Sequence, residues 1–437
     1  MVEQFLRTGM RTTDVIVTGL FSPAAVAAVG LADLYARLPL RIGLGLGSGV
    51  IALSSQDTGS GATANRDETI TQAILLGIVA GIPFMIFGLF FGHFAIEILG
   101  AESEVVRMGG IYLAIIFATS PARHVALIAA RAIQGTGDTR TPMYVNLVSN
   151  GMNIALTVIL GLGVGPAPEL HIIGVGIATA VGNIFTAVAL LIAIWRPWTP
   201  ASFARPKQWT IMKQLMVISA PRIVEGIATF ILDFPFNAIL LIFGTEVNAA
   251  YQIGRRVYQQ LTSPLSRGYR TGTTIIVGQS LGGGDSAAAR FNGWAATGLG
   301  ILTVGGLGLV VFVLSDPFVR LFTADPETAK LAIEFARTYA LIAPLTVSYI
   351  ILAGALTAGS DTKTPFIART SGMFLGMVAV PYLFGLQLEW GITVLYAGIG
   401  IYYLWATIYV FIGFYRGRWV ELTETMMAKR GSVNTED

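Results

Sequence analysis

Long apolar segments follow one another along the whole chain and are separated by short polar connections. Each spans about 20 residues or more and carries few charges, which is the pattern of membrane-crossing helices. Twelve such segments are predicted, at 1–20, 26–54, 70–99, 105–133, 142–164, 171–195, 210–243, 247–280, 288–315, 328–357, 365–387 and 390–415. The pattern therefore predicts an all-α, polytopic membrane protein with 12 transmembrane helices.

One short polar run occurs twice, half a chain length apart. Gly-Asp-Thr-Arg-Thr-Pro at 137–142 recurs as Ser-Asp-Thr-Lys-Thr-Pro at 360–365, 223 residues later. The same offset relates Gln56, Gly59 and Gly61 to Gln279, Gly282 and Gly284. Both runs end Thr-Pro, which predicts helix N-caps at Thr141 and Thr364. The chain is expected to contain two copies of one unit.

Six helices in each half make the copies parallel repeats, related by an axis along the membrane normal. The predicted parts are an N-terminal lobe (1–195), a proline-rich cytoplasmic linker (196–209), a C-terminal lobe (210–415) and a cytoplasmic tail (416–437). The seventh helix begins near Thr210, which maps thirteen residues before Met1. The first helix is therefore expected to be shorter than its counterpart. Either the true start codon lies upstream of Met1, or the protein tolerates a short first helix. Helical prolines such as Pro121 and Pro344 predict bends.

Loop cations predict the orientation. One set of loops, with the tail, holds most of them: Arg66, Arg140, Arg196, Arg205, Lys207, Arg290, Lys363, Arg416, Arg418, Lys429 and Arg430. The opposite loops hold mainly Asp and Glu. The positive-inside rule then places both termini in the cytoplasm. The expected location is the plasma membrane.

Composition agrees with this interpretation and excludes other classes. The chain of 437 residues is 54% apolar and 12% charged, with a mean hydropathy of +0.68, whereas soluble domains are about 25% charged. It has no cysteine, and its three histidines lack metal-ligand spacing. No nucleophile–base motif is present. We expect no enzyme activity, no cofactor, no nucleic-acid partner and no metal other than Na⁺ at Asp14.

Ionisable residues inside membrane helices are costly and are therefore candidate sites. Asp14, in the first segment, could bind a proton or Na⁺; the structural alternative is pairing with Arg7 or Arg11. Its repeat counterpart is Asn237, a candidate residue of the substrate cleft. This asymmetry predicts that the first half carries the coupling ion.

The fifth segment carries a polar stripe. Asn146, Asn150, Asn153 and Thr157 are four, three and four residues apart, so they share one helix face. The stripe suits cation coordination or substrate binding, or it holds helices together. Thr179 in the sixth segment is a further candidate of this kind.

Other charged residues within segments have structural alternatives. Asp33 and Arg37 have the spacing of a helical ion pair, and Asp33 is also a candidate cleft residue. Arg222 and Glu225 predict a second internal pair. Asp233 is a candidate ion or substrate site, with pairing to Arg255 or Arg256 as the alternative.

These features together resemble the multidrug and toxic compound extrusion (MATE) family over nearly the whole chain. The resemblance rests on 135–142, 278–284, Thr13-Asp14-Val15 with the run 22–30, and Asn150–Asn153. It implies two six-helix lobes that rock about a central cleft. It also implies efflux of amphipathic, often cationic compounds, driven by entry of Na⁺ or H⁺. The expected partners are a small-molecule substrate and the lipid bilayer, and the expected state is a monomer.

The resemblance also assigns site residues. Asp14 matches the family's first-helix aspartate, Asn153 a fifth-helix asparagine and Thr179 a sixth-helix threonine of the same site. The chain departs from the family pattern at Thr157, where relatives often have a second aspartate, and at Met10, where a tyrosine is frequent. A seventh-helix glutamate found in some relatives is not evident. One carboxylate suits H⁺ better than Na⁺, which requires neutralisation and several oxygens.

The alternative is a lipid-linked oligosaccharide flippase of the same superfamily. Its support comes from arginines inside the predicted helices, which would suit an anionic substrate: Arg37, Arg41, Arg123, Arg222, Arg255, Arg267, Arg270 and Arg337. If they line the cleft, the flippase is favoured; if they pair internally, drug efflux is favoured. A channel is disfavoured because alternating access explains the repeat better.

Overall fold

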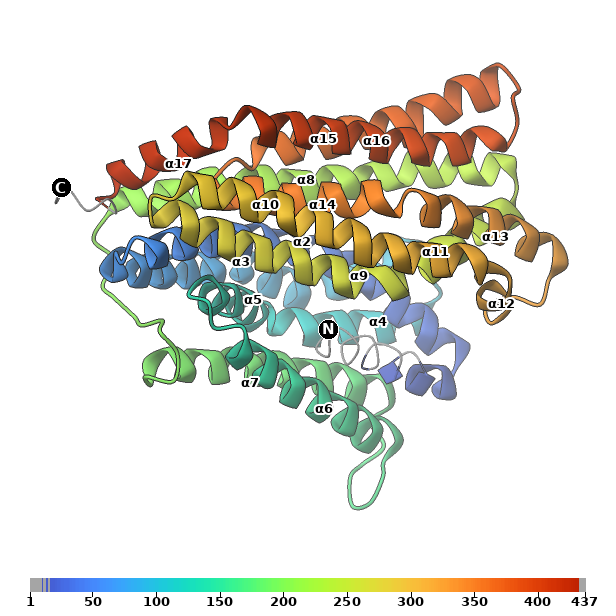
Figure 1. Ribbon diagram of the computed structural model, residues 1–437. Coiled ribbons are helices and arrows are strands. Elements are labelled where there is room, and N and C mark those ends of the chain that lie inside the picture. Colours follow the sequence, from blue (N-terminus) through green and yellow to red (C-terminus); the bar gives the residue numbers. More distant parts are fainter. Residues whose placement is uncertain (1–9, 11–12, 15, 432–437) are drawn as a thin grey trace. The chain divides into compact units, whose positions relative to one another are not determined.

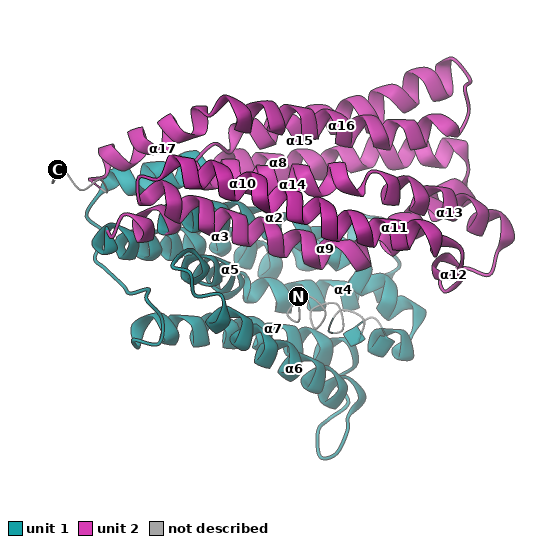
Figure 2. Cartoon of the chain, viewed as in Figure 1, with its two compact units in different colours: residues 1–54, 62–219 teal, residues 55–61, 220–437 magenta. Residues whose placement is uncertain are grey.

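The computed structural model describes residues 10, 13, 14 and 16–431 (Figure 1). Every regular element in these residues is helical, which confirms the predicted all-α class. The chain divides into two compact units, coloured separately in Figure 2. Unit 1 comprises Met1–Ser54 and Ala62–Ser219, and unit 2 comprises Ser55–Gly61 and Ala220–Asp437.

The helices of unit 1 follow the apolar segments of the first half. They are most of α2 (Pro23–Gly59), then α3 (Thr63–Glu97), α4 (Ser103–Ala118), α5 (Ser120–Gly135), α6 (Arg140–Leu162), α7 (His171–Trp195) and the start of α8 (Trp209–Phe243). α6 and α7 lie side by side (Figure 1). Ser149 of α6 donates a hydrogen bond to the carbonyl of Gly182 in α7 at 2.9 Å.

Unit 2 contains the remaining helices. They are the rest of α8, α9 (Thr245–Gly282), α10 (Ser286–Gly300), η1 (Ile301–Gly305), α11 (Gly306–Val313), α12 (Ser315–Arg320), α13 (Pro326–Leu341), α14 (Ala343–Ala358), α15 (Lys363–Met373), η2 (Phe374–Ala379), η3 (Pro381–Gln387), α16 (Thr393–Arg416) and α17 (Arg418–Lys429). The three η elements are π-helical turns that continue their neighbouring α-helices.

Eight of the described helical segments are long and apolar enough to cross a membrane, and ten qualify if each of two bent pairs is one span. α4 and α5 meet at a bend of 47°, and α13 and α14 at a bend of 51°. Pro121 and Pro344 lie at the starts of α5 and α14, at equivalent positions of the repeat. Proline supplies no backbone N–H and obstructs the preceding turn, so the predicted bends are confirmed here.

Two of the twelve predicted spans are not among these ten. The segment 1–20 lies largely outside the described residues. The segment 247–280 is helical and forms α9, but it carries Arg255, Arg256, Arg267 and Arg270. These charges lower its hydropathy below that of a lipid-exposed span. Arg256 and Arg267 are exposed, and Arg255 and Arg270 are half-buried.

The repeated polar run caps helices in a way that the sequence prediction missed. α6 begins at Arg140, and Asp138 Oδ1 accepts hydrogen bonds from the backbone N–H groups of Arg140 and Thr141, both at 3.0 Å. Asp361 Oδ1 likewise accepts from the N–H of Thr364 at 3.0 Å. The predicted threonine N-caps are therefore wrong. The aspartate is the acceptor because its carboxylate reaches the free N–H groups of the first turn.

The second copy of the run also joins a buried polar network, called here the Gln56 network: Gln56, Asp57, Ser360 and Arg430. Gln56 Nε2 donates to Ser360 Oγ at 3.0 Å, and Arg430 donates to Gln56 Oε1 at 2.8 Å. The ion pair between Arg430 and Asp57, at 2.8 Å, has no exposed side-chain surface on either residue. The network ties the end of α2 to the residue that follows α17.

Gly59 and Gly282 mark a close approach of two helix ends that the repeat relates. A Cβ on Gly59 would lie 2.0 Å from the carbonyl oxygen of Gln279, and a Cβ on Gly282 would lie 2.0 Å from that of Gln56. The contact is reciprocal, since each glycine faces the glutamine of the other copy. Only glycine permits the two backbones to come this close.

Replacing Gly59 with Ala is therefore expected to destabilise the protein by about 3 kcal/mol, the upper end for overpacked sites. The added methyl group meets a backbone atom, which cannot move aside as a side chain can. Thermal unfolding in detergent measures the loss. Gly272→Ala is the matched control, because α9 has open space there and alanine favours a helix. A Gly59→Ala protein as stable as the control would contradict the close approach.

The connection between the halves packs against α3. Glu68 is buried, and its Oε1 accepts hydrogen bonds from the backbone N–H groups of Lys207 and Gln208, both at 2.5 Å. Arg66 Nη2 donates to the carbonyl of Pro200 at 2.6 Å. The proline-rich linker is thus held to unit 1 by polar contacts.

Candidate functional site

The predicted coupling carboxylate, Asp14, lies in helical backbone and is half-buried. Thr157 on α6 is buried, and its hydroxyl donates a hydrogen bond to Asp14 Oδ1 at 3.0 Å. Thr18 donates to the backbone carbonyl of Asp14 at 2.6 Å. The fold therefore brings together two residues that are 143 positions apart. Arg7 and Arg11, the alternative partners of Asp14, lie outside the described residues.

Asn153 lies one turn before Thr157 on α6 and is also buried. Its Nδ2 lies 3.5 Å from Thr179 Oγ1 on α7, at the limit of a hydrogen bond. Its Oδ1 is buried and accepts no hydrogen bond within the described part of the chain. A buried acceptor without a donor costs free energy, which binding of a proton donor or a cation would recover.

Tyr112 on α4 is a neighbour that the sequence analysis did not identify. It is buried, lies close to Thr179, and is within electrostatic range of Asp14, Asp33 and Arg123. A tyrosine in an apolar segment gives no sequence signal, because aromatic residues are common in membrane helices. Its hydroxyl adds a neutral donor and acceptor to this part of unit 1.

The rest of the α6 stripe is less enclosed. Asn146 and Asn150 are half-buried, whereas Ser149 is buried. Ser149 and Thr186 are linked by a hydrogen bond of 2.8 Å between α6 and α7. Ser149 and Thr186 therefore help to hold α6 and α7 together.

The remaining candidates lie on α2 and α8. Asp33 and Arg37 are both exposed on α2. On α8, Asn237 Nδ2 donates to the backbone carbonyl of Asp233 at 2.6 Å. Asp233 is within electrostatic range of Arg255.

The predicted pair of Arg222 and Glu225 is confirmed as an ion pair on α8. The structure adds a third member, Arg369 of α15, whose Nη1 lies 3.2 Å from Glu225 Oε1. Spacing along one helix revealed the first pair. Arg369 is 144 residues from Glu225, so no local pattern could reveal the second pair.

In the described residues no group of three or more His, Cys, Asp and Glu side chains could hold a metal ion. The oxygens near Asp14 come from one carboxylate, hydroxyl groups and an amide. Such a set suits a proton or an alkali-metal cation rather than a transition metal.

Comparison with known proteins connects this arrangement to one family. The family model MatE matches residues 1–159 and also 221–382, as expected for a repeated unit. A probable multidrug resistance protein NorM of Bradyrhizobium diazoefficiens is 27% identical over 414 residues, which cover 92% of this chain and 87% of the relative. A protein of the same name from Thermotoga maritima is 22% identical, covering 96% and 90% of the two chains.

Solved structures show the same fold. A MOP superfamily transporter from Pyrococcus furiosus superposes with a TM-score of 0.87 at 18% identity, covering 97% of this chain and 94% of that one. An outward-facing multidrug resistance MATE family transporter gives a TM-score of 0.85 at 18% identity, with the same coverage. The protein is a multi-pass membrane protein and not an enzyme. Both copies of the repeat match the family model, and the chain belongs to the MATE family of membrane transporters.

Proposed function

We propose that the chain is an ion-coupled antiporter that exports amphipathic, mainly cationic compounds in exchange for H⁺ or Na⁺. The hydrogen bond from Thr157 to Asp14 is the observation that carries the proposal. It places a hydroxyl donor on a carboxylate in a membrane helix, where an ionisable residue marks a candidate ion site. Relatives named as probable multidrug resistance proteins support export as the direction.

The proposed mechanism is competition. Ionised Asp14 favours a state that accepts a cationic substrate, and binding of H⁺ or Na⁺ at Asp14 favours the state that releases it. The lobes 1–195 and 210–415 would alternate between inward- and outward-facing states. Coupling requires that ion and substrate bind these states with different affinities.

H⁺ is the ion that we favour. Na⁺ away from water requires neutralisation and several oxygen ligands. Asp14 is the one carboxylate in the group formed with Thr157, Asn153 and Thr179. A proton needs only that carboxylate.

The flippase alternative has less support. Its main argument was that helix arginines face an anionic substrate. Several of them instead contact described partners: Arg222 pairs with Glu225, Arg255 donates to Tyr251, and Arg337 pairs with Glu334. We further propose that the protein acts as a monomer in the plasma membrane, with both termini in the cytoplasm.

Dye efflux from proteoliposomes tests the function. The full chain is reconstituted with a fluorescent cationic dye inside, and a pH gradient and a Na⁺ gradient are imposed separately. Efflux driven by the pH gradient alone is expected. Efflux driven only by Na⁺ would contradict H⁺ coupling but keep the antiporter. No efflux under either gradient, with phospholipid translocation present, would favour the flippase.

A further inference from the structure

Arg222, Glu225 and Arg369 form a charged cluster inside unit 2, called here the arginine cluster. Both oxygens of Glu225 are used, Oε2 by Arg222 and Oε1 by Arg369. The residues lie on α8 and α15, in segments apolar enough to cross a membrane. Two guanidinium groups share one carboxylate, so the cluster carries a net positive charge.

Arg369 is the member of the cluster that retains free binding capacity. Its side chain is 34% exposed, compared with 7% for Arg222 and 3% for Glu225. Its Nη1 donates to Glu225 and its guanidinium also lies within hydrogen-bond reach of Tyr402, whereas its Nε is buried without a partner in the described residues. A guanidinium has five N–H donors in a planar fork that matches an oxyanion. Arg369 therefore has donors, charge and access for an oxyanion.

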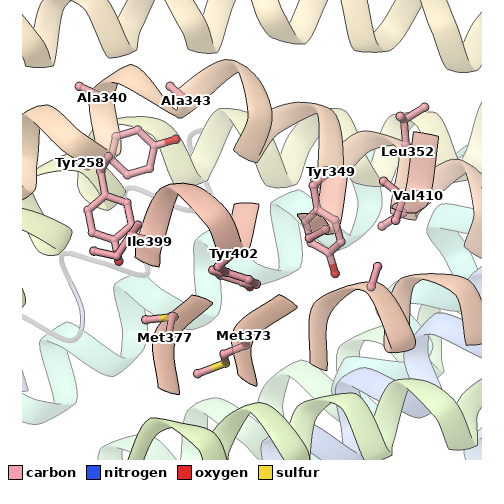
Figure 3. Close-up of a cluster of buried hydrophobic side chains, with 14 of the residues drawn as sticks. Tyr258, Ala340, Ala343, Tyr349, Leu352, Met373, Met377, Ile399, Tyr402 and Val410 are labelled. Carbon is pink, nitrogen blue, oxygen red and sulfur yellow. The ribbon is translucent and has the colours of Figure 1, made fainter. Parts of the chain in front are cut away.

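Tyr349 of α14 and Tyr402 of α16 flank the cluster. Both are buried, and both are within electrostatic range of Glu225 and Arg369. Figure 3 shows the two tyrosines in one apolar cluster with Met373 and Met377, which follow Arg369 along the chain. Tyrosine hydroxyls can donate to an oxyanion, and the flexible methionines adapt to apolar ligands. The surroundings suit an oxyanion carried on an apolar or aromatic body.

We propose that the arginine cluster binds the carboxylate, or a similar oxyanion group, of a zwitterionic transport substrate. An uncompensated positive charge in apolar surroundings costs free energy, and an anionic group on the ligand offsets that cost. The proposal rests on the proposed export function and widens its substrates from cationic to zwitterionic compounds.

A purely structural cluster is the competing explanation, because a buried ion triad can simply hold helices together. The two explanations predict opposite effects of one substitution on oxyanion binding. Removing positive charge with Arg369→Gln should weaken oxyanion binding. Removing the competing carboxylate with Glu225→Gln should strengthen it. A structural cluster would be damaged by both substitutions.

Two dyes that differ at one group provide the test. Rhodamine 110 has a free carboxylate, and rhodamine 123 is its methyl ester. Binding of each to the purified full chain is measured by fluorescence anisotropy. Arg369→Gln is expected to weaken rhodamine 110 binding about tenfold or more, with little change for rhodamine 123. Glu225→Gln is expected to tighten rhodamine 110 binding.

Arg337→Gln is the matched control, since Arg337 is partly exposed and pairs with Glu334. Arg369→Lys keeps the charge and should give an intermediate loss, which tests the proposal even if Arg369→Gln does not fold. Equal losses for both dyes, or no rhodamine 110 binding by the wild type, would overturn the proposal. Failure of the proposed function itself would instead remove binding and efflux of rhodamine 123.

A lipid phosphate is the other source of an oxyanion. Binding is therefore repeated in nanodiscs of phosphatidylcholine with and without phosphatidylglycerol. Unchanged rhodamine 110 affinity supports a substrate carboxylate. Competition by phosphatidylglycerol that disappears in Arg369→Gln would assign the cluster to lipid and overturn the proposal.

Discussion

Replacing Asp14 with Asn is expected to reduce gradient-driven dye efflux to the rate of protein-free liposomes. Asparagine has the same shape and can still accept the hydrogen bond from Thr157, but it carries no charge. It therefore cannot take up a proton or neutralise a cation. The ion then binds the inward- and outward-facing states with equal affinity, and the coupling free energy between ion and substrate falls to zero.

Two further variants make this result specific. Asp316→Asn removes an aspartate that is exposed and paired with Arg320, so efflux should match that of the wild type. Thr157→Val removes the hydrogen bond and keeps the carboxylate, so efflux should be reduced but not lost. Unchanged efflux in a folded Asp14→Asn protein would refute the role of Asp14.

Replacing Arg430 with Met is expected to lower the free energy of unfolding by about 3–5 kcal/mol, the range for breaking a buried ion pair. The substitution leaves Asp57 charged and without its cation, and neither side chain of the pair has exposed surface. It also removes the hydrogen bond to Gln56 Oε1. Thermal unfolding in detergent and trypsin cleavage after residues of α17 measure the loss.

A double-mutant cycle tests whether the loss comes from the charge. Asp57→Asn combined with Arg430→Met removes both charges, so much of the stability should return. Arg418→Met is the matched control, because it removes an exposed cation at the start of α17 outside the Gln56 network, and it should unfold like the wild type. Additive losses in the double variant would contradict a coupled ion pair.

The sequence predicted the helices and the repeat because both leave regular signals. Apolar segments marked the membrane helices, and an offset of 223 residues related the two halves. The same offset relates Pro121 to Pro344 and Gly59 to Gly282, pairs that prove equivalent in their bends and contacts. Such features depend on composition and on local backbone geometry, which a sequence records directly.

Long-range partners were not predictable in the same way. The resemblance grouped Asp14 with Asn153 and Thr179, but the chain departs from the family pattern at Thr157, which contacts Asp14. Tyr112 and Arg369 gave no local signal. Their roles depend on how helices far apart in sequence pack together. The N-caps were misassigned because Asp and Thr are both good capping residues at neighbouring positions. Only the geometry of the first turn decides between them.

The reciprocal contact of Gly59 with Gln279 and of Gly282 with Gln56 has an evolutionary consequence. A contact in which each partner offers the same residues is the kind that joins two identical subunits. A chain of half this length would form the same glycine–glutamine contact as a homodimer, and its two subunits would then have identical sequences. In one continuous chain the two copies are free to differ in sequence. The two copies do differ at the candidate ion site, where one has Asp14 and the other has Asn237. A homodimer of identical subunits would carry the same residue at both positions.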